Sequence, residues 1–175
     1  EESFKIFNIL LGDKWAPKVA LLVSLTSFAG ALCLLSQYNL GNEISYTQLW
    51  IAKPKIYLAF QADGLALAML LLTTALTPII IFSSFGNTYK NSKAFYALIV
   101  FMSFAMSGTF LASHGLLYYI FWELALIPIY FIALIWGNGD AETRKDAVVK
   151  FFIYTLAGSL FMLVGFAYLY AKSGS

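Results

Sequence analysis

Long apolar segments alternate with short polar segments along the whole chain. Charge-free apolar stretches occupy Val19–Tyr38, Gly64–Ser84, Ala94–Ser113, Gly115–Trp136 and Phe151–Ala171. Each is close to the roughly 20 residues that an α-helix needs to cross the hydrocarbon core of a bilayer. The pattern therefore predicts an all-α fold, a polytopic bundle of about five transmembrane helices.

We place this bundle at residues 18–175 and treat residues 1–17 as a separate N-terminal segment. The predicted spans are 19–38, 64–84, 94–113, 115–136 and 148–171. The N-terminal segment is apolar only from Ser3 to Leu11, which is too short for a crossing. It fits an interfacial helix or the remnant of a longer one. The chain starts without Met, and this favours a fragment of a longer protein.

Composition supports the membrane assignment and excludes other classes. The chain is 61% hydrophobic and only 11% charged, with a net charge of +2. Its mean hydropathy is +0.77. A positive charge this small and this scattered gives no reason to expect nucleic acid as a partner, whereas the lipid bilayer is one. The single cysteine, Cys33, lies in an apolar stretch and predicts neither a disulfide nor a metal site.

The basic residues predict how the bundle is oriented. If five helices alternate in direction, eight lysines and arginines fall on the side of the N-terminus and three on the other side. The basic side is expected in the cytoplasm or the mitochondrial matrix. The eight are Lys5, Lys14, Lys18, Lys90, Lys93, Arg144, Lys145 and Lys150, and the three are Lys53, Lys55 and Lys172.

Three connections between the spans have distinct characters. Asn39–Asp63 becomes an external connection, in which Tyr46, Trp50 and Tyr57 are candidate interfacial anchors. The connection around His114 is so short that its two flanking helices must be antiparallel neighbours. Gly137–Ala147 contains glycines and mixed charges and reads as a solvated turn.

Glu123 stands alone in the middle of the apolar stretch Gly115–Trp136. An acidic group at the centre of a spanning helix costs roughly 3 kcal/mol on insertion scales, so such groups face a partner or a wet cavity. We therefore predict that Glu123 handles protons or ions. Pro128 adds to this prediction because it leaves the carbonyl of Leu124, beside Glu123, without its helical donor. Tolerance of prolines such as Pro78 and Pro128 by membrane helices is the plainer explanation.

Lys150 is the second candidate for proton transfer. It lies at the predicted cytoplasmic start of the last helix, where its flexible stem either extends to the surface or turns into the bundle. The sequence leaves both open. Two further titratable residues have plainer explanations: Asp63 caps the helix that follows it, and His114 is a polar residue at a helix junction, with a proton-entry role as the alternative.

Signatures of soluble enzymes are missing from the sequence. It contains no glycine-rich phosphate loop, no nucleophile elbow and no Cys or His cluster with metal-ligand spacing. A lone buried acid, with a lysine at the start of the next helix, fits ion translocation better than bond chemistry.

Three segments resemble a known family. The segments are Phe121–Phe131 (FWELALIPIYF), Lys150–Ser159 (KFFIYTLAGS), and Asp63–Leu65 with the following Leu-Leu-Thr and Leu-Thr-Pro. In that order, they resemble the fifth, sixth and third helices of the antiporter-like membrane subunits of respiratory complex I, the proton-pumping NADH:quinone oxidoreductase. The resemblance is highly specific from Gly115 to Leu160 and weak before Gly12.

This resemblance implies a 14-helix proton-translocating subunit. Its fifth-helix glutamate, which pairs with a lysine on a broken seventh helix, matches Glu123, and its sixth-helix lysine matches Lys150 in a supporting role. The chain stops before the seventh helix, so the partner lysine would be absent. The implied partners are other membrane subunits of complex I in a bacterial or mitochondrial inner membrane, and no cofactor is expected in this chain.

Two alternatives stay open at this stage. One is a monovalent cation/proton antiporter subunit of the multisubunit type, which shares the same helix motifs. The other is a structural membrane scaffold, in which Glu123 forms a salt bridge to a neighbouring subunit.

Overall fold

A computed structural model describes residues 15–42, 44–51, 56–87 and 89–173 of the chain. Within these residues, five helices are long and apolar enough to cross a membrane. They are α2 (Ala16–Asn39), α3 (Gly64–Ser83), α4 (Ser92–Leu111), α5 (Gly115–Trp136) and α6 (Ala141–Ser173). The prediction of an all-α bundle of five spanning helices is confirmed. The predicted N-terminal segment lies outside the described residues, except for 15–17.

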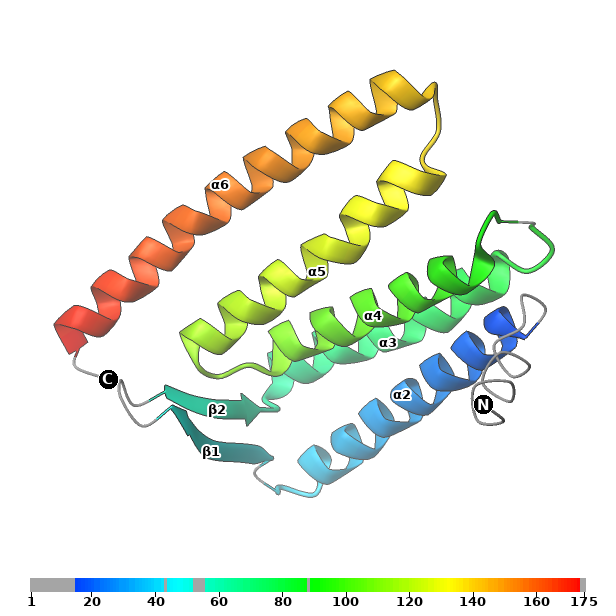
Figure 1. Cartoon of the computed structure of the whole chain (residues 1–175). Helices are drawn as coiled ribbons and strands as arrows, with labels where there is room; N and C mark the ends of the chain where they lie inside the picture. Colours follow the sequence, from blue (N-terminus) through cyan, green and yellow to red (C-terminus); the bar gives the residue numbers. More distant parts are fainter. Residues whose placement is uncertain (1–14, 43, 52–55, 88, 174–175) are drawn as a thin grey trace, which may run out of the picture.

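The helices follow one another across the bundle and alternate in direction (Figure 1). Helix α4 contacts α2, α3 and α5, whereas α6 contacts α5. The start of α2, the α3–α4 connection and the α5–α6 connection lie at one end, so Lys18, Lys93 and Arg144 share that end, as the alternating topology predicts. Its assignment to the cytoplasm or matrix stays a prediction.

A two-stranded hairpin at the other end was not predicted from the sequence. Strands β1 (Ser45–Ile51) and β2 (Ile56–Gln61) pair antiparallel, with Ser45 opposite Gln61 and an irregularity between Leu49 and Ile51. The amide of Ser113 donates to the carbonyl of Ala59 at 2.9 Å, which holds β2 against the α4–α5 junction. The three proposed anchors are in these strands and are exposed: Tyr46, Trp50 and Tyr57.

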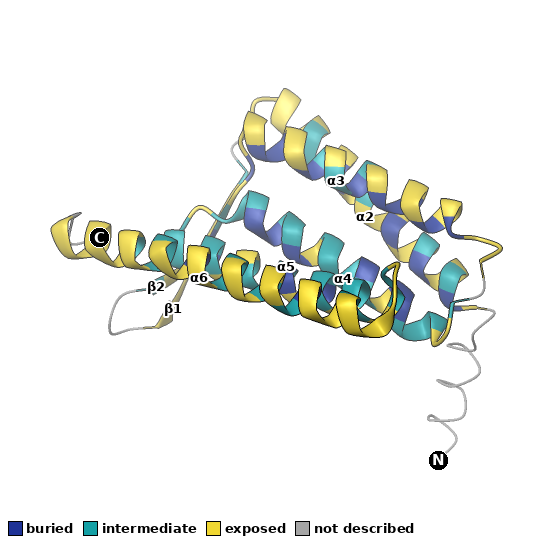
Figure 2. Ribbon diagram, turned by 90° about the horizontal axis from the view of Figure 1, so that it is seen from above, coloured by how far each residue is buried: buried dark blue, intermediate teal, exposed yellow. Residues whose placement is uncertain are grey.

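The best-buried part of the bundle lies where α2, α3 and α4 meet. One cluster surrounds the fully buried Ile81, and a second surrounds Leu67, which is 1% exposed. Figure 2 shows buried residues concentrated in α3 and α4 and exposed residues along most of α6. The described residues therefore cover more of the surface of α3 and α4 than of α6.

Helix α6 begins earlier than predicted. Residues 141–147 were assigned to a solvated turn, but they form the first two turns of α6. The carboxylate of Asp140 accepts a hydrogen bond from the amide of Thr143 at 2.9 Å, as an N-cap does. The backbone and side-chain hydrogen bonds from Thr143 lower the pKa of Asp140 from its usual value. Only Gly137–Asp140 remains as a connection.

Candidate functional site

Glu123 lies in the interior of α5, a 22-residue helix without any other charged residue. Its side chain is partly covered, and the Oε1 atom is buried with no hydrogen-bond partner among the described residues. It is the only buried side-chain polar atom of that kind in the part of the chain that the structure describes. Because an unsatisfied buried polar atom costs free energy, this carboxylate is a strong candidate for a functional group.

The position of Glu123 on α5 turns it away from α4. Phe121 faces α4, since its ring lies 5.9 Å from that of Phe104 and a side-chain atom at Gly108 would meet it at 2.3 Å. Glu123 follows two residues later, and two residues of an α-helix turn through about 200°. Tyr119 and Tyr130, at spacings of four and seven residues, share its face of the helix.

That face borders α6. The ring of Tyr130, on that face, packs 5.0 Å from Phe152, and the ring of Tyr118, on another side of α5, lies 6.3 Å from Phe166. These two contacts set the register of the antiparallel pair and place Glu123 level with residues near Ser159. Ser159 is 5% exposed, and its hydroxyl donates to the carbonyl of Leu156 at 2.8 Å.

Pro128 occupies the position within α5 that the sequence indicates. It is among the most deeply buried side chains of the described residues. Having no N–H, it cannot donate to the carbonyl of Leu124 four residues earlier. The carbonyl of Leu124, the residue directly after Glu123, therefore lacks its helical hydrogen-bond donor.

Lys150 is not brought to Glu123. Its Nζ atom lies 2.6 Å from the carboxylate of Asp146, one turn earlier on α6, and the two side chains are 62% and 65% exposed. The α5–α6 register puts Lys150 level with about Ala133, ten residues or about 15 Å from Glu123 along the helix axis. The two candidates lie on neighbouring helices at different depths.

Asp63 and His114 both cap helices. The Oδ1 atom of Asp63 accepts from the amide of Ala66 at 2.7 Å, which confirms the predicted N-cap of α3. The Nδ1 atom of His114 accepts from the amide of Leu116 at 3.3 Å at the start of α5. His114 also lines a cavity of about 410 Å³ between the start of α5 and the end of α6. These contacts explain both residues without a proton-transfer role.

Arg144 has a structural role that sequence reasoning missed. Its guanidinium donates to the carbonyls of Leu134 at 2.9 Å, Gly137 at 2.9 Å and Gly139 at 3.2 Å. These bonds satisfy acceptors at the end of α5 and in the α5–α6 connection. A Cβ atom at Gly137 would lie 2.3 Å from the carbonyl oxygen of Ala133, so glycine is required there. In the sequence, Gly137 and Gly139 followed by Arg144 were the signal from which this role could have been predicted.

The described residues contain no group of three or more His, Cys, Asp or Glu side chains that could hold a metal ion. Cys33 is a free cysteine that is exposed on α2. The chemistry that the described site offers is binding and release of protons or cations at a carboxylate.

Comparison with known proteins identifies the class. Residues 112–175 match the family described as NADH:quinone oxidoreductase/Mrp antiporter, TM. The fold is similar to a chain in the Mrp complex from Dietzia sp. DQ12-45-1b, with a TM-score of 0.79 and 17% sequence identity, over 95% of this chain and 18% of that one. Residues 112–175 are therefore similar in sequence to the membrane domain of this family, and the whole described bundle is similar in fold to that chain.

Sequence relatives refine the resemblance. The chain is 35% identical over 169 residues to NADH-ubiquinone oxidoreductase chain 4 of Mycosarcoma maydis, covering 96% of this chain and 34% of that protein. It is 32% identical to NADH-quinone oxidoreductase subunit M of Rickettsia prowazekii, covering 91% and 33%. It is also 36% identical to F(420)H(2) dehydrogenase subunit M of Methanosarcina mazei, covering 66% and 23%.

The chain thus spans about a third of the length of the curated relatives it matches most extensively. Its described residues form five helices long and apolar enough for a multi-pass membrane protein, and the relatives named above are described as subunits of oxidoreductases and a dehydrogenase.

Proposed function

We propose that this chain is part of a proton-translocating membrane subunit of NADH:quinone oxidoreductase, with Glu123 as a proton-relay carboxylate. The observation that supports this proposal is the buried, unpartnered Oε1 atom of Glu123 in an otherwise uncharged spanning helix. The similarity to subunit M and chain 4 proteins supports NADH:quinone oxidoreductase as the complex in this proposal.

The proposed mechanism is electrostatic. A carboxylate in a low-dielectric interior responds strongly to nearby charge, because charge interactions there are far less screened than in water. When a basic group approaches, the carboxylate releases its proton, and when that group withdraws, the carboxylate takes a proton up again. Alternation between these two states passes protons stepwise across the helix bundle.

Lys150 acts in this proposal as a supporting group at the basic end of the bundle. Its flexible stem and its exposed ion pair with Asp146 allow the ammonium to change partners at low cost. At a distance of about 15 Å along the axis it reaches Glu123 only through intervening water or other groups. Lys150 therefore supplies or accepts protons at the entrance.

The redox chemistry belongs to other subunits. We propose that this chain binds no flavin, iron–sulfur cluster or quinone, and that it works beside other membrane subunits in a bacterial or mitochondrial inner membrane. Its part in the enzyme is to couple their reaction to proton movement.

The test is redox-driven proton pumping in vesicles that hold the complete complex with Glu123→Gln. Glutamine keeps the size and polarity of the side chain but carries no exchangeable charge. We expect pumping to fall by about a hundredfold, as when a positioned proton-transfer group is lost, in a complex that still assembles on a native gel. Glu142→Gln, at the exposed start of α6, is the control. Undiminished pumping in Glu123→Gln would remove the relay role.

A monovalent cation/proton antiporter subunit is the second candidate, favoured by the similarity of the fold to the Mrp complex chain. The subunits that copurify with the full-length protein separate the two candidates. Redox subunits support the first, and further antiporter subunits without redox centres support the second. A structural scaffold is a third possibility, and it predicts that Glu123→Gln leaves transport intact because a hydrogen bond replaces the salt bridge.

A further inference from the structure

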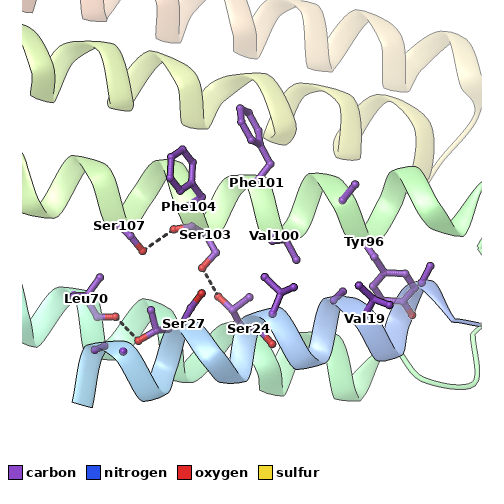
Figure 3. A pocket seen from close by; sticks show the side chains of 18 of the residues that line it. Val19, Ser24, Ser27, Leu70, Tyr96, Val100, Phe101, Ser103, Phe104 and Ser107 are labelled. Carbon is purple, nitrogen blue, oxygen red and sulfur yellow. Dashed lines mark hydrogen bonds between the residues drawn. The ribbon is translucent and has the colours of Figure 1, made fainter. Parts of the chain in front are cut away.

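A large groove lies between α2, α3 and α4, on the side of α4 away from α5. Its volume is about 920 Å³. Residues of all three helices line it, and Figure 3 shows several of them, among them Val19, Ser24, Leu70 and Val100. The groove extends from Ala16 to Leu34 along α2, which is about 27 Å at 1.5 Å per residue and close to the thickness of a bilayer core.

Three hydroxyl groups of the groove are already hydrogen-bonded within their own helices. Thr74 donates to the carbonyl of Leu70 at 2.7 Å, Ser107 to that of Ser103 at 2.8 Å, and Ser24 to that of Leu21 at 2.8 Å. Two of these bonds are drawn in Figure 3. Because these three hydroxyls are satisfied by their own helices and most other lining residues are apolar, the interior of the groove suits an apolar occupant.

One end of the groove is basic. Lys93, in the first turn of α4, lines the groove, is only partly exposed and forms no ion pair within the described residues. Lys18 lies at the same end beside the lining residue Val19, and its Nζ is 4.7 Å from the ring of Trp15. Helices α2, α3 and α4 and the α3–α4 connection contain no aspartate or glutamate. This end therefore complements an anion.

The spacing along α4 fits one membrane leaflet. From Lys93 to Ser103 the helix rises about 15 Å, half of the roughly 30 Å hydrocarbon core. Ala97 and Val100 line the groove between these two residues. A molecule with a negative headgroup at Lys93 and an apolar chain along Ala97 and Val100 has the shape of a lipid in the leaflet on the basic side.

We propose that this groove binds an anionic phospholipid, with its phosphate at Lys93 and an acyl chain beside Ala97 and Val100. Anionic headgroups bind in basic pockets between transmembrane helices on the cytoplasmic or matrix side. The predicted orientation places the Lys93 end on that side. The lipid seals the apolar groove and neutralises a lysine that no carboxylate of these three helices reaches.

The test measures lipid retained by the complete complex after reconstitution with phosphatidylglycerol and phosphatidylcholine and re-extraction into detergent, by mass spectrometry. Lys93→Gln should retain about fivefold less phosphatidylglycerol, the contribution of one lysine near an anionic surface. Lys145→Gln, an exposed lysine at the same end but on α6, should retain as much as wild type. Ala97→Phe should exclude the lipid by filling the groove, and Ala157→Phe, at an exposed alanine of α6, should not.

Equal retention of phosphatidylglycerol by wild type and Lys93→Gln would overturn the proposal, as would equal retention of the two lipids by wild type. If Ala97→Phe blocks assembly and Lys93→Gln retains lipid like wild type, the groove holds a protein helix and not a lipid. If Ala97→Phe fails to assemble, the amount of phosphatidylglycerol that Lys93→Gln retains still decides whether the groove binds the lipid.

Discussion

Helices α3 and α4 differ from α5 in whether their buried polar groups have hydrogen-bond partners. In α3 and α4, where about a third of each span is buried inside the structure, the buried hydroxyls of Thr74, Thr77 and Thr109 each donate to the carbonyl four residues earlier. In α5, where only 11% of the span is buried, Glu123 has a buried oxygen without any partner in the described residues. The satisfied hydroxyls are accounted for by packing, whereas the unsatisfied carboxylate is the observation on which the proposed relay role rests.

The first prediction tests the packed region by removing a buried side chain from it. Ile81→Ala removes a completely buried side chain from the cluster between α2, α3 and α4. We expect a loss of about 3 kcal/mol in the free energy of unfolding, because a core isoleucine contributes transfer energy and leaves a cavity. Denaturation of the full-length protein in detergent measures it. Ile79→Ala, at a 59% exposed isoleucine of the same helix, is the control and should change stability far less.

The second prediction concerns the two candidate transport residues. Lys150→Gln should reduce redox-driven pumping only about threefold, whereas Glu123→Gln should nearly abolish it. The reason is that Lys150 is exposed and paired with Asp146, and an exposed ion pair is worth less than about 1 kcal/mol. The proton-pumping assay on the assembled complex measures both. A loss in Lys150→Gln as deep as in Glu123→Gln would mean that the lysine is an essential relay group.

The smallest predicted effect concerns a hydroxyl between two helices. Thr77 donates to the Oγ atom of Ser103 at 3.0 Å as well as to its own helix. Thr77→Val should lower stability by about 0.6 kcal/mol, the average for interhelical hydrogen bonds in membranes, and should leave pumping unchanged. Thr155→Val, at a partly exposed residue whose hydroxyl is bonded within α6, provides the matched change. A pumping defect in Thr77→Val would show that the hydroxyls of α3 and α4 do more than pack.

The spanning helices were predictable because membrane crossing depends mainly on length and hydropathy. The prediction for residues 115–136 matches α5 at both ends, and the prediction for 64–84 differs from α3 by one residue. The start of α6 was placed seven residues too late, because hydropathy marks the apolar span and not the capped polar turns that precede it.

The hairpin was missed for a related reason. Strand β1 has exposed residues throughout and β2 only one buried residue, so neither shows a clean alternation of apolar and polar positions. The available signal was composition, since the segment Ser45–Gln61 is rich in aromatic and β-branched residues around Pro54.

The site was only partly predictable. The isolation of Glu123 in an apolar helix is visible in the sequence, and so is the capping position of Asp63. The depth of Lys150 relative to Glu123 depends on the α5–α6 register, which ring contacts such as Tyr130 with Phe152 determine. The guanidinium bonds of Arg144 likewise depend on the geometry of the turn.

The central claim is that Glu123 gains and loses a proton during turnover. Redox-triggered infrared difference spectroscopy of the complete complex measures this directly, because a protonated carboxyl group has its own C=O stretching band. We predict a carboxyl band in wild type and in the Glu142→Gln control that is absent in Glu123→Gln. Identical spectra for wild type and an assembled Glu123→Gln complex would contradict the claim.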